Sequence, residues 1–263
     1  MKLNLELQKV VDDIAETAGY IWEKGWAARN AGNLSVDVTE LVTSKIQSPV
    51  VPINLPLGIT LPDLAGRYFV VKITGFRFRD LARKPEKGLL LVRISEKADA
   101  YHYIWGGEGP GSKPTAEFIP HLKIQDFLHR NKQPEKAVLH THPPHLIALT
   151  HLEDYGRESF NCFLWATHVG AKLFLPEGVG MVPFLRGGSA ELADATAELF
   201  SKHRAVLWEK HGCTAIGSDI MDAFDTTDML DTTAKVHLIC KSAGFASKCL
   251  TDAQLAELKK LAI

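Results

Sequence analysis

The stretch AVLHTHPPHLIAL, residues 137–149, places two histidines one residue apart within an otherwise apolar run. A buried imidazole needs a hydrogen-bond partner, so an apolar strand ordinarily carries Val or Leu at such positions. Side chains at i and i+2 of a strand share a face, which puts His140 and His142 side by side. Pro143 and Pro144 then end the strand and suit the first turn of a helix. The pair is therefore predicted at a strand end, where ligands bind in α/β sheets.

A His-x-His pair alone favours metal binding only slightly over two solvated or hydrogen-bonded histidines. His211, in LWEKHGCTAIG, follows a predicted strand and precedes a glycine, and Glu117, in PTAEF, lies in the first turn of a predicted helix. Each also has an ordinary explanation. His211 fits a surface turn, and Glu117 fits an acid that interacts favourably with the helix dipole. As a set they are more specific, because three histidines on one cation leave an open position, as in catalytic zinc sites.

The remaining histidines carry weaker expectations. His145, on the helix after the pair, is placed to support it by hydrogen bonding, and His102 alternates with two tyrosines on a predicted strand. Five others are expected on helix surfaces: His121, His129, His151, His203 and His237.

Hydrophobic periodicity predicts an α/β protein. The predicted strands come in successive pairs between helices, which favours a three-layer α/β/α arrangement with a mixed central sheet over a regular doubly wound sheet. No repeat or linker divides the chain, so residues 1–263 are expected to form a single domain. Helices are predicted over residues 5–24, 114–130, 145–152, 189–203 (capped by Ser189), 219–243 and 251–262 (capped by Thr251). Strands are predicted over residues 34–38, 68–74, 89–95, 100–105, 137–142 and 171–176, with two more around His211.

Composition argues against several classes of protein. Of the 263 residues, 46% are hydrophobic and 23% are charged, as in ordinary globular proteins. The 30 Lys and Arg nearly balance the 31 Asp and Glu, so no basic excess predicts nucleic-acid binding. No run of 18 apolar residues predicts a membrane span. The four cysteines show no CxxC spacing and the first residues do not resemble a signal peptide, so a cytoplasmic location is expected.

Seven segments, in the same order along nearly the whole chain, resemble the class II aldolase/adducin family, and most closely its rhamnulose phosphate branch. They are GWAARNAGNLSV, YHYIWG, PTAEF, VLHTHPPHLIALT, LFLPEGVG, LWEKHGCTAIG and DAFDTTDMLDTTAK. The resemblance implies the class II aldolase fold and a zinc-dependent lyase, assembled as a cyclic homotetramer with active sites near subunit interfaces. It also implies a ketose phosphate substrate, L-rhamnulose 1-phosphate, cleaved to dihydroxyacetone phosphate and L-lactaldehyde, with no nucleic acid or membrane as partner.

The family's functional residues carry over position by position. Glu117 matches the catalytic acid/base, which exchanges a proton with the carbon whose bond is broken. The zinc ion stabilises the negative charge left beside the ketone, so no Schiff-base lysine is needed. The matching zinc ligands are His140, His142 and His211. The substrate and phosphate contacts that match are Asn30, Asn33, Thr74, Gly75 and Thr115.

The sequence departs from the pattern of this branch at three places. Gly170 stands where a second glutamate is usual, and His168, two residues earlier, is a candidate replacement. The phosphate turn reads ITGFRFRD instead of a T-G-S-G-K type, and Ala116 replaces a serine in PTAE. Metal chemistry is therefore expected with altered phosphate recognition, in which Arg77 or Arg79 supplies a charged contact.

Two other functions fit the same resemblance. One is a related metal-dependent lyase, epimerase or decarboxylase that acts on another sugar or sugar phosphate. The other is a non-catalytic scaffold like the adducin head, which would be expected to lack the metal ligands. The three histidines and Glu117 favour an enzyme.

Overall fold

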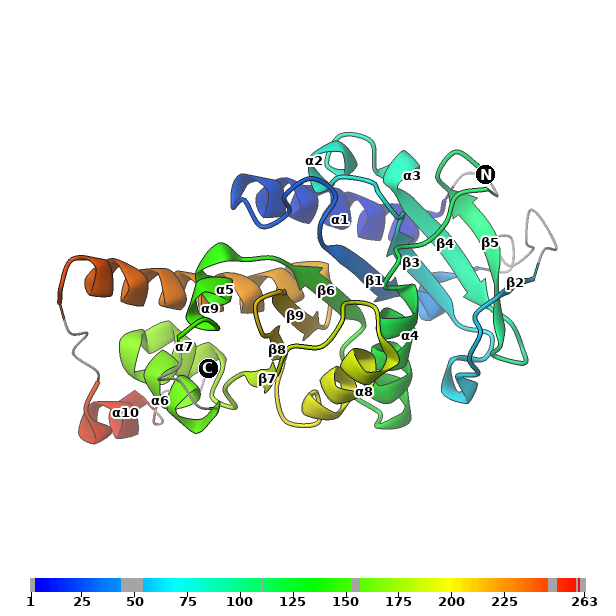
Figure 1. The fold of residues 1–263 in the computed structure, drawn as a ribbon. Coiled ribbons are helices and arrows are strands. Elements are labelled where there is room, and N and C mark those ends of the chain that lie inside the picture. Colours follow the sequence, from blue (N-terminus) through cyan, green and yellow to red (C-terminus); the bar gives the residue numbers. More distant parts are fainter. Residues whose placement is uncertain are drawn as a thin grey trace.

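The computed structural model describes residues 3–43, 54–109, 111–152, 157–245, 250–258 and 260. These residues form a nine-stranded sheet in the order β2-β5-β4-β3-β1-β6-β9-β8-β7, with helices on both faces (Figure 1). Neighbouring strands are antiparallel except for β7 and β8, which are parallel. The strands are β1 (Asn33–Asp37), β2 (Leu55–Pro56), β3 (Tyr68–Lys72), β4 (Leu89–Ile94), β5 (Ala100–Gly106), β6 (Ala137–Thr141), β7 (Gly180–Val182), β8 (Ala205–Trp208) and β9 (Gly212–Gly217).

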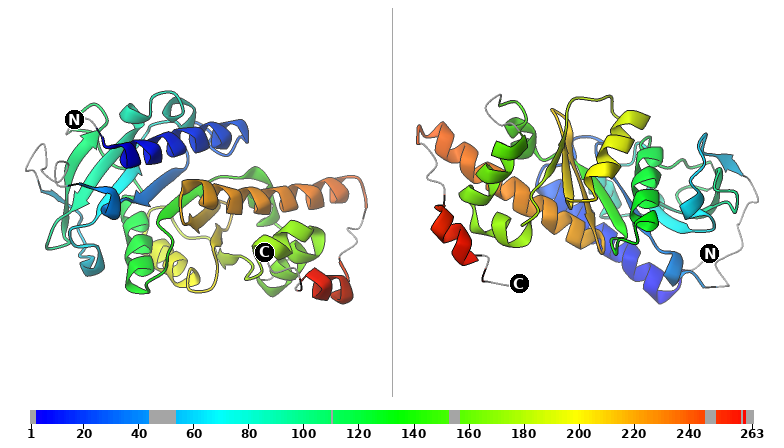
Figure 2. Two further views of the ribbon diagram at one scale, coloured as in Figure 1. Left: turned by 180° about the vertical axis from the view of Figure 1, so that it is seen from behind. Right: turned by 90° about the horizontal axis from the view of Figure 1, so that it is seen from below.

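The helices form one layer on each face of this sheet. Leu7 of α1 and Leu230 of α9 belong to the core on one face, whereas Ile124 of α4 and Leu192 of α8 belong to a core on the other. The view from below in Figure 2 shows the strands between these two layers. The predicted three-layer arrangement with a mixed sheet is confirmed. The helices are α1 (Leu5–Glu23), α2 (Phe78–Leu81), α3 (Pro85–Gly88), α4 (Phe118–Arg130), α5 (Pro144–Leu149), α6 (Arg157–Thr167), α7 (Val169–Phe174), α8 (Ala190–Leu199), α9 (Ile220–Ser242) and α10 (Asp252–Leu258), with 3-10 turns η1 (Thr39–Leu41) and η2 (Pro62–Leu64).

Alternation along β6 decides where its histidine points. Leu139 packs in the core beneath α1 and α9, and Val138 packs in the core beneath α4 and α8. Because alternate residues of a strand share a face, His140 points to the same side as Val138. The register places His140 opposite Asn33 on β1 and Thr214 on β9, near the middle of the sheet.

Two predicted caps are present. Ser189 Oγ accepts a hydrogen bond from Leu192 N at 3.2 Å at the start of α8. Thr251 Oγ1 accepts one from Gln254 N at 3.3 Å before α10. Both bonds satisfy backbone N–H groups that have no partner inside the helix. Residues 259, 261 and 262 of this predicted helix lie outside the described residues.

The predicted strand over residues 171–176 is wrong, because most of it lies in α7. Gly170 and Ala171 are buried, while Val169 and Phe174 are exposed, which is the pattern of a helix with one face against α6 and α9. A six-residue apolar run has no period that separates a strand from a buried helix. The preceding helix, α6, was not predicted.

Among the described helices, none combines the length and the apolar character needed to cross a membrane.

Candidate metal centre

Three histidines from two segments meet at the C-terminal end of β6. His140 lies on β6, His142 follows the end of this strand, and His211 lies in the turn that joins β8 to β9. One donor nitrogen of each residue lies within 4.8 Å of the other two. The Nε2 atoms of His140 and His142 are 3.1 Å apart. The structure thus brings together the three residues that were predicted as metal ligands.

A glycine lets the turn of His211 approach β6. A Cβ added to Gly212 would stand 2.4 Å from Thr141 O and 3.0 Å from His142 Cδ2. Any side chain at this position would therefore push the turn away from the strand. Only glycine keeps His211 within reach of the other two rings.

Hydrogen bonding orients the ring of His140. Its Nδ1 donates to Cys213 O at 3.0 Å, because a carbonyl oxygen can only accept. Nε2 is then left with a lone pair that faces His142, as in metal-ligating histidines whose other nitrogen is held by a carbonyl. The Trp208 ring stacks on His140 with centroids 4.3 Å apart and further limits its rotation.

Burial lowers the pKa of all three histidines. The pKa of His142 falls to about 4, and that of His140 falls well below its usual range. The neighbouring imidazoles lower both values further, because a charge on one ring disfavours a charge on the next. Burial also lowers the pKa of His211, which Glu117 partly opposes. The rings are neutral at pH 7, and neutral imidazole is the form that binds a metal.

Glu117 lies immediately before α4, beside the histidines but outside the cluster of donor nitrogens. Its Oε2 accepts a hydrogen bond of 2.6 Å from Asn33 Nδ2. A Cβ added to Gly187 would stand 3.4 Å from Glu117 Oε1 and 3.2 Å from His211 Cε1, so both side chains border the same space. This position suits proton transfer next to a metal ion better than coordination of it.

The expectation that His121 lies on a helix surface is wrong. Its side chain is buried, with Nε2 against Asn33 Oδ1 and Nδ1 3.0 Å from Ser35 Oγ. Gln125 Nε2 donates to the same Ser35 hydroxyl at 3.2 Å. Burial lowers the pKa of His121 to about 3, so the ring is neutral and its Nε2–H donates to Asn33. The Asn33 amide is thereby fixed with its NH₂ group toward Glu117.

The residues predicted at the phosphate end come from adjoining segments. Asn30 is exposed in the turn before β1, and Thr74 and Gly75 are exposed in the turn after β3. Thr115 is buried, and its backbone N–H donates to Lys72 O at 2.9 Å. Because of this bond, the segment before α4 lies against the end of β3. Asn33 differs from the others, because its side chain is engaged with Glu117 and His121.

Asp231 on α9 was not among the predicted site residues. This buried carboxylate accepts hydrogen bonds from Trp26 Nε1 at 3.3 Å, His145 Nδ1 at 2.9 Å and Leu146 N at 3.3 Å. The backbone N–H of His142 in turn donates to Trp26 O at 2.9 Å. His145 therefore supports the turn after β6 through Asp231.

Gly170, which stands in place of a glutamate, lies in a crowded position on α7. An added Cβ would stand 2.7 Å from Met229 Sδ and 3.0 Å from His168 Nδ1. Nδ1 of His168 accepts a hydrogen bond of 3.1 Å from Gly170 N and so caps this helix. A glutamate at residue 170 would require at least the Met229 side chain and the His168 ring to shift.

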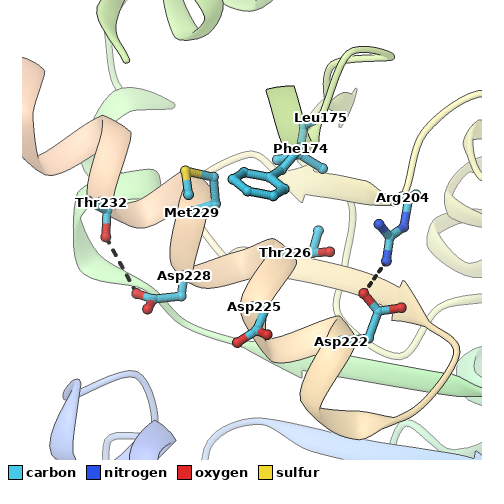
Figure 3. Close-up of a pocket in the computed structure, with 9 residues that line it drawn as sticks. All are labelled: Phe174, Leu175, Arg204, Asp222, Asp225, Thr226, Asp228, Met229 and Thr232. Carbon is cyan, nitrogen blue, oxygen red and sulfur yellow. Dashed lines mark hydrogen bonds and ion pairs between the residues drawn. The ribbon is translucent and has the colours of Figure 1, made fainter. Parts of the chain in front are cut away.

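A separate pocket of about 370 Å³ lies between α7 and α9 (Figure 3). Phe174 and Met229 line one side, and Asp222, Asp225 and Asp228 line another. Burial raises the pKa of Asp225, and the charges of the neighbouring aspartates raise it further. An acidic lining disfavours an anionic substrate, and none of the three histidines borders this pocket.

Comparison with known protein families agrees with this geometry. Residues 12–238 match the model of the class II aldolase and adducin N-terminal domain. The chain belongs to this family. Class II aldolases depend on a metal ion, and the three histidines could hold one.

Several relatives of this protein are named as particular aldolases within the family. A rhamnulose-1-phosphate aldolase of Bacteroides thetaiotaomicron is 38% identical over 255 residues, which cover 96% of this chain and 93% of the relative. One from Listeria monocytogenes is 29% identical over 251 residues, covering 94% and 91%. The crystal structure of a sugar-phosphate aldolase from Thermotoga maritima matches with a TM-score of 0.79 at 29% identity, covering 92% of this chain and 98% of that one. The predicted family and fold class are confirmed.

The metal-free protein is expected to lose stability as the pH falls from about 6.5 to 4. His140 and His142 stay neutral in the folded state, whereas in the unfolded chain they take up protons below their usual pKa of about 6.5. The unfolded state then binds more protons, so the free energy of unfolding falls with pH, by up to about 1.4 kcal/mol per pH unit for each histidine. Urea unfolding across this pH range measures the slope. His142→Gln should flatten it, and an unchanged slope would contradict the burial argument.

Proposed function

We propose that this protein is a metal-dependent aldolase that cleaves L-rhamnulose 1-phosphate to dihydroxyacetone phosphate and L-lactaldehyde. The observation that carries the proposal is the cluster of three neutral imidazoles with a carboxylate beside it that is not part of the cluster. Family membership and 38% identity to the aldolase of Bacteroides thetaiotaomicron support the choice of substrate.

We assign Zn²⁺ to His140, His142 and His211. Three imidazole nitrogens leave coordination positions open for substrate, as in catalytic zinc sites. The bound metal supplies a Lewis acid for the negative charge that develops on the substrate's oxygen atoms. The neutral rings and the fixed Nδ1–H of His140 favour this assignment.

The reaction leaves a proton balance that the protein must satisfy. In cleavage, the C3–C4 bond of the ketose breaks, its electron pair stays on C3, and the C4 hydroxyl gives up its proton to solvent water as the aldehyde forms. C3 then gains a proton to give dihydroxyacetone phosphate. We assign this last transfer to Glu117, which Asn33 holds in place at 2.6 Å.

The phosphate and ketose end is proposed to lie between the turn before β1 and the turn after β3. Asn30, Thr74, Gly75 and Thr115 border this region. Asn33 keeps one amide hydrogen for the ketose while it orients Glu117.

A homotetramer with active sites near subunit interfaces is also part of the proposal. The apolar side chains of Phe174, Phe184 and Phe245 are more than half exposed, at 52%, 70% and 70%. In the proposed tetramer these three side chains are candidates for burial between copies of the chain.

Aldol cleavage tests the proposed function directly. The metal-loaded protein is offered L-rhamnulose 1-phosphate and other ketose 1-phosphates, and release of dihydroxyacetone phosphate is measured with and without a chelator. We expect the fastest release from L-rhamnulose 1-phosphate, loss of activity with chelator, and recovery with added Zn²⁺. Preference for another ketose 1-phosphate would reassign the substrate. Absence of cleavage, or cleavage that resists the chelator, would contradict the proposal.

Two variants separate the metal ligands from the acid/base. His142→Ala should lose both bound metal and activity, because it removes one of three ligands. Glu117→Ala should keep the metal but lose about 10²–10⁴-fold in rate, the usual contribution of a general acid/base. Metal analysis and initial rates measure both, with the exposed His151→Ala as the control. Full activity in Glu117→Ala would remove this residue from the reaction.

A further inference from the structure

One lysine is buried at the end of a central strand. Lys72 is the last residue of β3, all five of whose residues are buried, and its side chain is 1% exposed. Its Nζ lies 3.5 Å from Asn30 O and 5.3 Å from the centroid of the Phe78 ring. Among the described residues, no carboxylate lies within ion-pair distance of this ammonium.

This arrangement costs stability and needs an explanation. An ammonium group has three N–H donors, and one carbonyl at 3.5 Å satisfies them only in part. A buried charge without a paired partner is strongly unfavourable, and an apolar residue of similar size would be better accommodated. The other four residues of β3 are Tyr, Phe, Val and Val, so nothing else in the strand calls for a charge. Such costs are typically retained where function requires them.

The position of Lys72 connects it to the proposed phosphate end. Its Nζ contacts the turn that carries Asn30, its carbonyl accepts from Thr115 N at 2.9 Å, and Thr74 follows two residues later. Burial lowers the pKa of Lys72 to about 8, with Glu117 opposing this, so the group still carries its charge at pH 7. The ammonium is therefore a positive charge at the turn of Asn30, and the backbone that carries it adjoins Thr115 and Thr74.

The two arginines predicted for this role are placed differently. The Arg79 guanidinium lies 5.3 Å from the centroid of the Trp22 ring on α1, and its Nε lies 3.9 Å from Asp80. Arg77 is exposed. Lys72, by contrast, reaches the turn of Asn30 from inside the protein.

We propose that Lys72 is the residue that selects phosphorylated substrates: its ammonium, beneath the turn of Asn30, provides the positive charge that binds the phosphate monoester of the ketose. The identity of the ketose rests on the proposed function, whereas the binding of phosphate by Lys72 does not. The charged ammonium compensates for the hydroxyl and serine donors that are missing from ITGFRFRD and PTAE.

The first test uses inorganic phosphate as the probe and needs no catalysis. Its affinity for the metal-loaded protein is measured by titration calorimetry for the wild type, Lys72→Met and Lys87→Met, the last being an exposed lysine on α3. Loss of a charged hydrogen bond predicts about 10–100-fold weaker binding to Lys72→Met and unchanged binding to Lys87→Met. Equal affinity in the wild type and Lys72→Met, or no binding to the wild type, would overturn the proposal.

The second test is a comparison of substrates. For Lys72→Met, the ratio of kcat/KM for L-rhamnulose 1-phosphate to that for L-rhamnulose should fall about 10–100-fold, mainly through KM. Lys72→Arg should recover part of this ratio. An equal loss for both sugars would show a merely structural role and overturn the proposal. The proposal would also be overturned if this ratio of kcat/KM values fell in Arg77→Met but not in Lys72→Met.

Two controls keep the outcomes apart. Lys72→Met removes a buried charge, so its Tm should equal or exceed that of the wild type, and weaker phosphate binding then cannot come from unfolding. If the wild type cleaves neither sugar, the proposed function fails, while phosphate titration still decides the role of Lys72.

Discussion

Gly212 lies so close to the end of β6 that an added Cβ would stand 2.4 Å from Thr141 O. Because Gly212 has no side chain, the turn of His211 can lie against the strand of His140, and the candidate site depends on this close approach. The same closeness removes water from the three rings, which is why burial dominates the lowering of their pKa values. Backbone geometry thus produces a cluster of neutral donors before any metal arrives.

Two charged side chains near this cluster, Glu117 and Lys72, are held in place by different neighbours. Glu117 keeps its position through Asn33, whose amide is oriented by the buried chain of His121, Ser35 and Gln125. Lys72 approaches from the opposite face of the sheet, because it alternates with Val71, which packs toward α4. Glu117 and Lys72 thus carry opposite charges without forming an ion pair, and Glu117 raises the pKa of Lys72 against the effect of burial.

Much of this could be predicted from the sequence. Period-two alternation placed His140 and His142 on one face, and the glycine after His211 marked its turn. The three-layer fold followed from the order of strands and helices.

Prediction failed where an apolar run was too short to show a period, or where a side chain's hydrogen-bond partners lie far away in the sequence. The apolar run at residues 171–176 has no distinguishing period, and the burial of His121 depends on Asn33 and Ser35, more than 80 residues away in sequence. Lys72 did leave a signal, as a charge in the apolar run FVVKI, but a metal-based mechanism gave no reason to look for it.

Zinc-edge X-ray absorption spectroscopy of the metal-loaded protein tests the central claim most directly. We predict three imidazole nitrogens at about 2.0–2.1 Å with oxygen completing the shell, and the same spectrum for Glu117→Gln. Sulfur should be absent, because burial raises the pKa of the Cys213 thiol to about 12. Fewer than three imidazoles, a sulfur ligand, or a shell that changes with Glu117→Gln would contradict a metal centre built from His140, His142 and His211.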